Sequence, residues 1–344
     1  MSNNIIIDKI YALLSKLKIS GTNKPLSESV ESIKEINGKY YVTIECHRQD
    51  AQTYQKLSDS ANQLLHAEKL DCEIILTNKK QAVAPQAIDK RQKVNGVGKI
   101  ITIVAGKGGV GKSTIALNLA ITFAQSGKRV GLVDADIYGP SLTTLSGISS
   151  KPALENNLMV PIIKFGLKMM SVSFLMQPDD ALIWRGPMIT KMLYQLMHLT
   201  QWNFDGKDID ILIVDTPPGT GDIHLSLAEN YHVDGSIVIS TPQQMAVSDV
   251  VRAISMLNKL NIPVLGLIEN YSYLLGDNGN KQFIFGKNGN SAKICKKFSI
   301  PLLADIPYCV ELNEASNTSK PLTYYKLKHT INTIFSNIIT NLNL

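Results

Sequence analysis

The sequence predicts an α/β protein whose main domain is a doubly wound, mostly parallel sheet, preceded by a small α+β domain. Two observations carry this prediction. Residues 106–114 read G-K-G-G-V-G-K-S-T, which fits the phosphate-binding pattern G-x-x-x-x-G-K-[ST] and lies between an apolar β-branched run and a stretch of helical periodicity. From Gly98 onward such runs and stretches alternate, as expected when crossover helices cover both faces of a parallel sheet. The 344 residues suffice for this domain and a smaller one.

Residues 1–80 form the first predicted domain. Its elements follow the order helix, strand, strand, helix, strand, and the Asn37-Gly38 pair between the first two strands strongly indicates a hairpin. The expected elements are a helix over Asn4–Leu17, strands over Glu28–Ile33 and Tyr40–Glu45, a helix over Ala51–Ala67 and a strand over Cys72–Leu76. Residues 81–97 show little hydrophobic pattern and are predicted to form a linker.

Residues 98–344 form the second predicted domain, with a fold of the P-loop NTPase type. The expected strands are Ile100–Val104, Val130–Val133, Ile211–Val214, Gly235–Ile239, Val264–Ile268 and a short one near Leu302–Leu303. The expected crossover helices cover residues 113–125, 187–200, 246–260 and 289–298. In such a sheet the ligand lies at the carboxyl ends of the strands.

The chemistry of polyphosphate binding explains the residues of the loop. Several backbone N–H groups have to face the phosphates, and glycine allows both their close approach and unusual backbone angles. Lys112 supplies a charge to the outer phosphates, and Ser113 offers its hydroxyl to Mg²⁺ at the N-terminus of the next helix. We therefore expect ATP and Mg²⁺ as ligands, with the nucleotide bound by Gly106, Lys107, Gly108, Gly109, Val110, Gly111, Lys112, Ser113 and Thr114.

Carboxylates at the ends of two strands complete the predicted site. Asp134 and Asp136 follow the run over 130–133, and we expect Asp136 to orient the attacking water and Asp134 to support the Mg²⁺ shell. Asp215 follows four apolar residues, which is the Walker B arrangement, and would hold Mg²⁺ directly or through a water. Residues 215–222 read D-T-P-P-G-T-G-D, a segment that can respond to the γ-phosphate.

The composition of the whole chain restricts the remaining function classes. The formal net charge is +6 and the lysines are scattered, so a nucleic-acid partner is not indicated. The apolar run Ile5–Ile7 is too short for a signal peptide, and no apolar run reaches the length of a membrane span. The four cysteines, at 46, 72, 295 and 309, are too far apart in sequence for a metal knuckle or a redox pair. We therefore expect a cytoplasmic protein with reduced thiols.

Lys107 extends the loop to K-G-G-x-G-K-[ST], which resembles the deviant loop of the MinD, ParA, nitrogenase iron protein and Mrp group of dimeric ATPases. This resemblance implies a homodimer in which Lys107 reaches the phosphates bound by the partner subunit and takes part in hydrolysis. Further blocks are similar to the Mrp (ApbC) family over roughly residues 98–325. They are D-A-D-I-Y-G-P-S at 134–141, W-R-G-P-M at 184–188, D-T-P-P-G-T-G-D at 215–222 and S-T-P-Q at 240–243.

The resemblance to the Mrp family implies an ATP-hydrolysing carrier that binds iron–sulfur clusters and transfers them to apoproteins. Its expected partners are an iron–sulfur assembly scaffold and apoprotein clients. The first domain is similar, by pattern alone, to the small iron–sulfur assembly domain that often precedes this ATPase. Asn270 follows the strand over 264–268, and its amide carries a donor and an acceptor that suit an adenine edge. Together with the resemblance, this favours base recognition by Asn270.

The sequence departs from the family where the cluster would be held. Family members commonly carry C-x-x-C between an E-N pair and a later I-F-G, but the corresponding interval here, Tyr271–Phe283, contains no cysteine. The [4Fe–4S] cluster that the resemblance implies therefore lacks thiolates at this place, and harder side chains replace them poorly. Three alternatives stay open: the cluster is labile, it is held by Cys295 or Cys309 from both subunits, or a partner supplies it. An apolar stripe around Cys295 also fits a plain core position.

The competing interpretation is a MinD- or ParA-like ATPase that positions itself on a membrane, DNA or a partner protein. MinD proteins use an amphipathic C-terminal tail on membranes, with a basic polar face. The amphipathic helix predicted over Tyr325–Leu342 has mainly Asn, Thr and Ser on its polar face, so we expect it to pack on the ATPase core. The W-R-G-P-M block favours the carrier. A scaffold without turnover is disfavoured because every expected ATPase residue is present.

Overall fold

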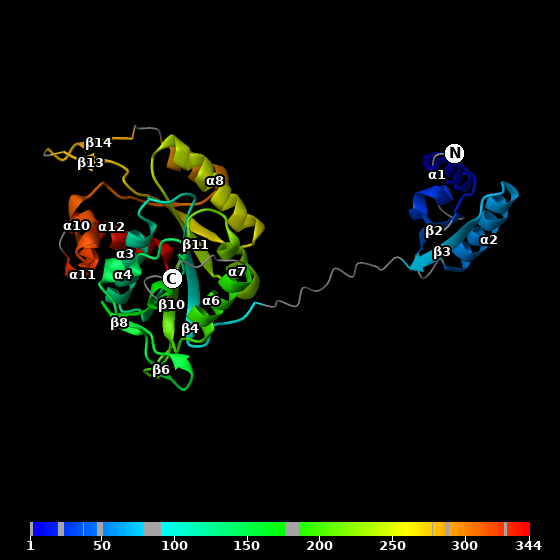
Figure 1. Ribbon diagram of the computed structural model, residues 1–344. Helices are drawn as coiled ribbons and strands as arrows, with labels where there is room; N and C mark the ends of the chain where they lie inside the picture. Colours follow the sequence, from blue (N-terminus) through cyan, green and yellow to red (C-terminus); the bar gives the residue numbers. More distant parts are fainter. Residues whose placement is uncertain are drawn as a thin grey trace. The chain divides into compact units, whose positions relative to one another are not determined.

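The computed structural model describes residues 3–19, 24–36, 38–46, 51–78, 91–175, 186–276, 278–285, 289–326 and 329–344. The chain divides into two compact units, residues 1–89 and 90–344, and Figure 1 labels many of their elements. Trp184 and Arg185 of the W-R-G-P-M block lie outside the described residues, as does most of the predicted linker.

The first unit has the predicted order of elements. It contains α1 (Asn3–Leu14), a 3₁₀ turn (Leu26–Ser29), β1 (Val30–Ile36), β2 (Lys39–Cys46), α2 (Ala51–Ala67) and β3 (Cys72–Asn78). β1 and β2 pair antiparallel across the expected hairpin, and β3 pairs parallel with β2. Alternate residues of β2 are buried, namely Tyr40, Val42, Ile44 and Cys46, because successive side chains of a strand point to opposite faces of the sheet.

Several boundaries in this unit differ from the prediction, and two of the differences have a clear cause. The helix expected over 4–17 ends at Leu14, because Leu17 turns away and accepts a hydrogen bond from the N–H of Leu26 at 2.8 Å. The strand expected over 28–33 begins at Val30, because Glu28 belongs to the 3₁₀ turn that follows Pro25. The first difference comes from a contact between Leu17 and Leu26, and the second from a local turn after Pro25; hydrophobic periodicity alone reports neither.

The second unit is built on one eight-stranded sheet with the order β15-β12-β11-β4-β10-β5-β9-β8. Its strands are β15 (Leu302–Asp305), β12 (Val264–Glu269), β11 (Gly235–Ser240), β4 (Val97–Ala105), β10 (Ile209–Asp215), β5 (Val130–Asp134), β9 (Leu167–Ser171) and β8 (Ile162–Lys164). All neighbours pair parallel except β8, which is antiparallel to β9. The α/β fold with a mostly parallel sheet is confirmed, and it includes all six predicted strands.

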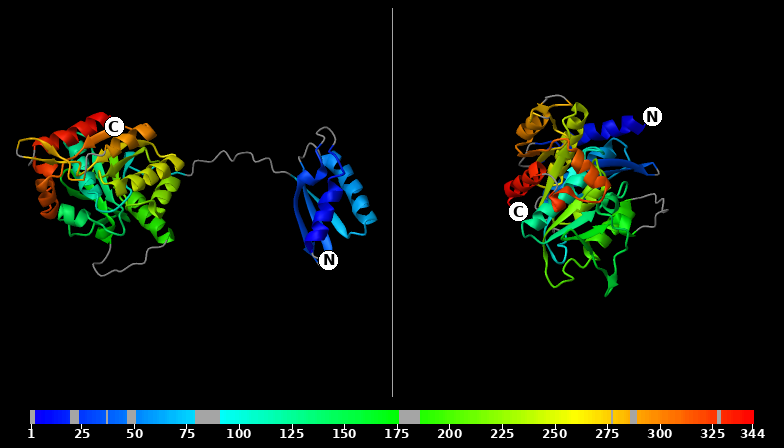
Figure 2. Two further views of the ribbon diagram at one scale, coloured as in Figure 1. Left: turned by 90° about the horizontal axis from the view of Figure 1, so that it is seen from above. Right: turned by 90° about the vertical axis from the view of Figure 1, so that its left-hand side faces the viewer.

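Helices cover both faces of this sheet (Figure 2). The first face carries α3 (Lys112–Gln125), α4 (Leu142–Ser146), α10 (Val310–Asn317), α11 (Leu322–Tyr325) and α12 (His329–Leu342). The second face carries α6 (Gly186–His198), α7 (Asp222–Asn230), α8 (Gln244–Lys259) and α9 (Asn290–Phe298). Side chains of β4 alternate between the faces: Ile101 and Ile103 belong to the first cluster, and Ile100 and Val104 to the second. This is the double covering that the continuous apolar runs predicted.

The end of the linker was placed wrongly at residue 97. Val94 is buried in the core of the second unit, and the N–H of Gln92 donates to the carbonyl oxygen of Asn230 at 2.8 Å. Residues 91–97 therefore belong to the second unit. Their sequence is polar except for two valines, so only the contacts with the rest of the unit reveal it.

The last two strands at one end of the sheet, β9 and β8, were not predicted. Lys168 interrupts the apolar run of β9, yet its ammonium is buried and donates to Asp205 Oδ1 at 2.7 Å and to the carbonyl oxygen of Trp202 at 2.6 Å. A buried lysine requires such partners, and they come from a distant segment of the chain. Remaining short elements are α5 (Val172–Leu175) and two small hairpins, β6–β7 (Leu154–Glu155, Leu158–Met159) and β13–β14 (Leu274–Leu275, Lys281–Gln282).

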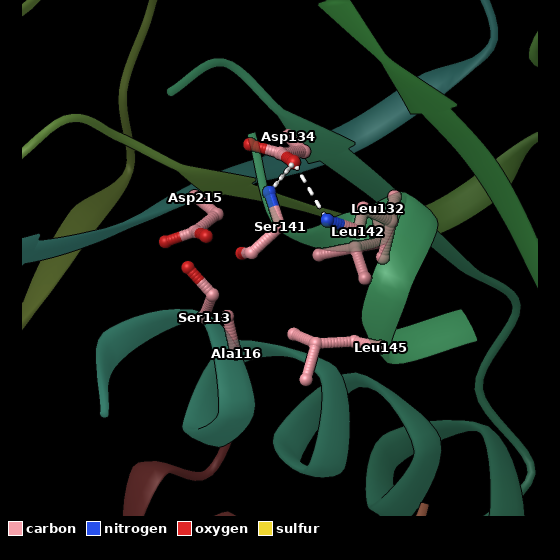
Figure 3. A pocket seen from close by; sticks show the side chains of 8 residues that line it. All are labelled: Ser113, Ala116, Leu132, Asp134, Ser141, Leu142, Leu145 and Asp215. Atoms are coloured by element: carbon pink, nitrogen blue, oxygen red, sulfur yellow. Dashed lines mark hydrogen bonds between the residues drawn. The ribbon is translucent and has the colours of Figure 1, made fainter. Parts of the chain in front are cut away.

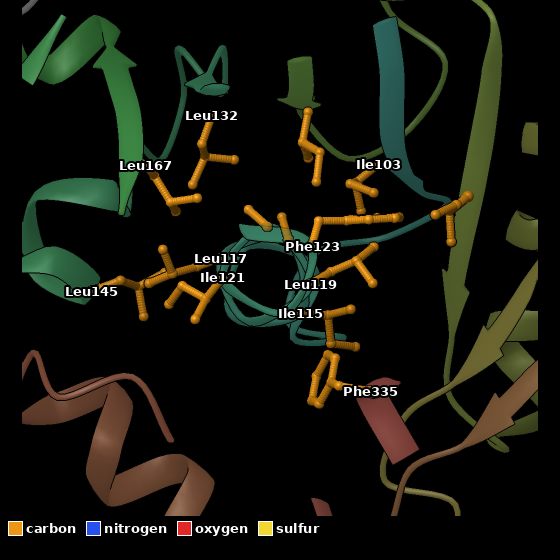
Figure 4. Packing of buried hydrophobic residues seen from close by; sticks show 14 of the residues in the cluster. Ile103, Ile115, Leu117, Leu119, Ile121, Phe123, Leu132, Leu145, Leu167 and Phe335 are labelled. Carbon is orange, nitrogen blue, oxygen red and sulfur yellow. The ribbon is translucent and has the colours of Figure 1, made fainter. Parts of the chain in front are cut away.

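The C-terminal helix α12 packs on the core, as expected. Ile331, Phe335 and Ile338 are at most 1% exposed and join the cluster around α3. Figure 4 shows Phe335 against the apolar side of α3, close to Ile115. Nowhere in the described ranges does a helix reach the length and apolarity needed to cross a membrane.

Replacing Phe335 with alanine should therefore lower the free energy of unfolding of the second unit by about 3–5 kcal/mol, the usual effect of emptying a buried phenylalanine site. Urea unfolding followed by tryptophan fluorescence reports on this unit, because both tryptophans, Trp184 and Trp202, belong to it. The matched control is Asn337→Ala on the exposed side of the same helix, with an expected change within about 0.5 kcal/mol. Equal stabilities of the two variants would contradict the packing.

Candidate functional site

The phosphate-binding loop leaves β4 at Ala105 and enters α3 at Lys112. A Cβ atom at Gly106 would lie 2.4 Å from a backbone atom of Asp249 in α8, so no other residue fits there. Gly109 and Gly111 have φ angles of +78° and +83°, which favour glycine. The loop backbone thus faces an open cavity of about 250 Å³, lined by Lys107, Gly108, Gly109, Val110, Gly111, Lys112, Ser113, Thr114, Asp136, Gly139, Ser141, Leu145 and Pro218.

Lys112 is the buried cation of this cavity. Its Nζ donates to Asp215 Oδ1 at 2.5 Å and lies 3.7 Å from Asp136 Oδ2. The side chain also donates to Ser113 Oγ at 3.3 Å. A buried ammonium that is paired with carboxylates stays charged, and phosphate oxygens that enter the cavity would compete with those carboxylates for it.

Backbone N–H groups fix the two aspartates that follow β5. Asp134 Oδ2 accepts hydrogen bonds from the N–H groups of Ser141 and Leu142, both at 3.0 Å, at the start of α4. Asp136 Oδ1 accepts from the N–H groups of residues 138 and 139 at 3.2 and 3.1 Å. Burial and the nearby Asp215 carboxylate raise the pKa of Asp134 to about 7. Burial also raises the pKa of Asp215, and the Lys112 ammonium opposes this shift.

A smaller cavity of about 10 Å³ lies beside the loop, between Ser113, Asp134, Ser141 and Asp215 (Figure 3). It has room for about one water molecule or small ion. Ser141 Oγ is buried and has no hydrogen-bond partner within the described part of the chain. Two carboxylates and two hydroxyls are the hard oxygen donors that suit Mg²⁺, and the carboxylates here outnumber the ammonium groups. The residues predicted to bind Mg²⁺, namely Ser113, Asp134 and Asp215, therefore lie together and fit this ion.

Lys107 lies on the open side of the loop and is half-buried. Its Nζ donates to Gln243 Oε1 at 2.7 Å, just before the first residue of α8. The amide is uncharged, so this contact leaves the charge of Lys107 uncompensated. The S-T-P-Q block had no assigned role, and only the structure shows that its glutamine contacts Lys107.

Asn270 contacts the loop itself. Its Nδ2 donates to the carbonyl oxygen of Val110 at 2.9 Å, and a Cβ at Gly111 would lie 2.4 Å from the same nitrogen. Its Oδ1 is buried and has no hydrogen-bond partner among the described residues. One of the two N–H donors of the Asn270 amide is therefore used by the loop, and its Oδ1 acceptor stays without a partner among the described residues.

The two cysteines considered as cluster ligands lie on opposite faces of the sheet. Cys295, on α9, belongs to the cluster of the second face, and burial raises its pKa. Cys309, just before α10, belongs to the cluster of the first face, and its thiol donates to Glu311 Oε2 at 3.1 Å. The sheet between them prevents the two thiols of one chain from sharing a cluster. In the part of the chain that the structure describes, no group of three or more Cys, His, Asp or Glu side chains is placed to hold a metal ion.

The interval without cysteine forms the β13–β14 hairpin, in which Leu274 faces Gln282. A cavity of about 150 Å³ lies at its base, lined by Leu274, Leu275, Pro307, Tyr308, Cys309, Val310, Glu311, Thr330 and Ile331. Cys309 thus borders the region where the family carries its thiolates, whereas Cys295 does not line this cavity.

Comparison with known proteins places this site in a family. The model of the family described as "ParA: NUBPL iron-transfer P-loop NTPase" matches residues 96–343. The chain belongs to this family. A relative from Rickettsia felis, named "Iron-sulfur cluster carrier protein", is 37% identical over 320 residues, which cover 92% of this chain and 94% of the relative. The predicted resemblance to the Mrp (ApbC) group of iron–sulfur carriers is thereby confirmed.

Solved structures agree with the assignment to the NUBPL family. A nucleotide-binding protein from Archaeoglobus fulgidus, in complex with ADP, is 31% identical with a TM-score of 0.57, covering 67% of this chain and 89% of that one. The cell division ATPase MinD of Pyrococcus furiosus is 21% identical with a TM-score of 0.53, covering 72% of this chain and 98% of that one. The second similarity shows the common fold alone.

Proposed function

We propose that this NUBPL-family protein is an ATP-hydrolysing carrier that binds iron–sulfur clusters and transfers them to apoproteins, in the cytoplasm. The arrangement that carries the proposal is the glycine-lined cavity in which Lys112 faces Asp215 and Asp136. The names of the relatives support the carrier part. An assembly scaffold and apoprotein clients are the proposed partners. A direct test is phosphate release from ATP, followed by transfer of a reconstituted cluster to a purified apoprotein.

Each predicted residue has a role in the proposed hydrolysis. The N–H groups of the loop bind the phosphates. The Lys112 ammonium gives up its hydrogen bond to Asp215 and donates to a phosphate oxygen instead. Ser113 and Asp215, with Asp134 behind them, would hold Mg²⁺, which supplies charge neutralisation when bound. Asp136 orients the water that attacks the γ-phosphate, and the N–H groups of residues 138 and 139 keep its carboxylate in place.

We propose that Asn270 selects the base through its Oδ1, which has no hydrogen-bond partner among the described residues. Its Oδ1 can accept a hydrogen bond from the 6-amino group of adenine, whereas guanine presents a carbonyl oxygen at that position. We therefore propose ATP, rather than GTP, as the nucleotide.

The proposed active form is a homodimer. The resemblance to the dimeric ATPases implies that Lys107 reaches the phosphates bound by the partner subunit. Replacing Lys107 with alanine should lower the rate of hydrolysis by about 10–10³-fold, because a cation next to transferring phosphates stabilises the transition state. The fold should be unaffected, since the hydrogen bond that Lys107 makes among the described residues goes to the uncharged amide of Gln243. Phosphate release measures the rate, and Lys151→Ala at an exposed site is the matched control. A strict monomer by light scattering with ATP and Mg²⁺, at high protein concentration, would count against the dimer.

Binding of the cluster is the second part of the proposal, and its candidate ligands are Cys295 and Cys309. Cys309 borders the cavity at the hairpin, while Cys295 is packed in the opposite core. We expect anaerobic reconstitution with iron and sulfide to give a labile cluster that Cys309→Ser weakens and Cys295→Ser leaves unchanged. Visible absorption and iron counting provide the measurement. A stable cluster that survives both substitutions together would exclude both thiols and leave Cys46 or Cys72. Failure to bind any iron would favour delivery by a partner.

The alternative function, a MinD- or ParA-like positioning ATPase, has no separate observation in its favour. The apolar face of α12 is occupied by the core, and the likeness to MinD concerns the fold. Co-sedimentation with liposomes and with DNA, each with and without ATP, tests this alternative. Binding to either that depends on ATP would favour it over the carrier.

A further inference from the structure

The segment that joins β10 to α7, residues 216–221, is anchored to the end of β4 by backbone hydrogen bonds, and we call it the switch segment. The N–H and Oγ1 of Thr216 both donate to the carbonyl oxygen of Ile103, and the N–H of Gly219 donates to that of Ala105 at 2.8 Å. Pro217 and Pro218 have no N–H to donate. Pro218 lines the nucleotide cavity, so the position of this segment affects the space left for the phosphates.

The structure adds one side-chain contact to this segment, made by His224. This residue lies in the first turn of α7, is 3% exposed, and places its Nε2 3.2 Å from the carbonyl oxygen of Pro217. Burial lowers the pKa of His224 to about 4, so the imidazole is neutral near pH 7. Because a carbonyl oxygen only accepts hydrogen bonds, Nε2 carries the proton and donates it.

Packing alone does not explain a histidine at this position. The neighbouring core positions of α7 hold Ile223 and Leu227, and a leucine would fill the same space without a polar group to desolvate. Pro217 itself is buried, so without the imidazole its carbonyl oxygen would have no donor among the described residues. His224 thus supplies a hydrogen bond that the proline-rich segment cannot make for itself.

We propose that His224 is a positioning residue, which fixes the switch segment through Pro217 and so holds Pro218 beside the phosphate-binding loop. The proposal rests on the ATP hydrolysis proposed above for this cavity. The hydrogen bond of His224 ends on the backbone two residues beyond Asp215 and not on a group of the phosphate-binding loop. Its effect should therefore fall on kcat, which depends on the arrangement of the segment, more than on the affinity for ATP.

Three substitutions of His224 separate a positioning role from a packing role. His224→Gln keeps an N–H donor of similar reach, His224→Leu keeps the volume without a donor, and His224→Asn keeps a donor that is too short. The matched control is Leu225→Ala, at an exposed position of the same helix. The full chain is used throughout.

The first measurement is hydrogen–deuterium exchange of peptides that span 215–222, without nucleotide, which does not depend on turnover. The amides of Thr216 and Gly219 should exchange at the native rate in His224→Gln and about tenfold faster in His224→Leu and His224→Asn. If the leucine variant does not fold, the asparagine variant provides the comparison. Native exchange in the variants without a suitable donor would overturn the proposal.

The second measurement is steady-state hydrolysis. We expect kcat to fall about tenfold in His224→Leu and His224→Asn, with KM for ATP within about twofold, and to return in His224→Gln. Loss of binding rather than turnover would also contradict a positioning role. A wild-type protein that hydrolyses no ATP would refute the proposed function, while the exchange rates would still decide whether His224 holds the segment.

Discussion

Replacing Lys112 with alanine is expected to weaken ATP binding and to lower hydrolysis by at least about 10²–10³-fold, comparable to removing a main electrostatic contact in other active sites. Two effects add. The substitution removes the only buried ammonium that lies beside Asp215 and Asp136 in the described cavity. It also leaves these carboxylates without their cation, so that they repel the incoming phosphates.

Titration with a fluorescent ATP analogue and a phosphate-release assay measure the two consequences of Lys112→Ala separately. The matched control is Lys293→Ala, an exposed lysine on α9, which should behave as the native protein does. Circular dichroism checks the fold, because a buried ion pair that loses one partner also destabilises the protein. Native affinity and native turnover in a folded Lys112→Ala protein would show that the nucleotide binds elsewhere.

Replacing Asp136 with asparagine is expected to leave ATP bound but to slow its hydrolysis by about 10²–10⁴-fold, the usual contribution of a group that directs a proton or a water molecule. Asparagine keeps an oxygen that can accept the N–H groups of Tyr138 and Gly139, so the loop after β5 should retain its shape. It loses the negative charge that orients the water. The alanine variant should show the same slow turnover, with a less ordered loop.

The dissociation constant for ATP should change by less than about threefold in Asp136→Asn, since Asp136 lies at the edge of the cavity and Lys112 pairs more closely with Asp215. Single-turnover phosphate release measures the chemical step directly. Asp59→Asn, an exposed aspartate of the first unit, serves as the control. Hydrolysis at the native rate would mean that another group orients the water, and Asp134 would be examined next.

Much of the site follows from sequence spacing because the residues lie at the carboxyl ends of neighbouring parallel strands. Asp134 and Asp215 end β5 and β10, which are adjacent in the sheet, and the phosphate loop follows β4 on the other side of β10. A pattern of apolar runs, each followed by a carboxylate or glycines, therefore predicts a common site without any knowledge of packing. In the first unit the order of elements was predicted from hydrophobic patterning and from the Asn37-Gly38 pair.

Side-chain partners, by contrast, did not follow from spacing. The buried ammonium of Lys168 in β9 finds its acceptors at Trp202 and Asp205, more than thirty residues away, so a strand with a charged residue was overlooked. The contact between Lys107 and Gln243 spans 136 positions, and the sequence contains no pattern that joins them. His224, without a metal-ligand spacing, gave no sign of a role.

The sequence by itself determined the nucleotide loop, the carboxylates around it and the absence of cysteine from Tyr271–Phe283, because each depends on residues that are near one another along the chain. Only the tertiary structure decided how the remaining groups are used. In the folded chain the amide nitrogen of Asn270 donates to the carbonyl oxygen of Val110. Cys295 and Cys309 lie on opposite faces of the sheet. The physical reason is that hydrogen bonds and burial depend on which elements pack together, and packing brings together residues that no local pattern relates.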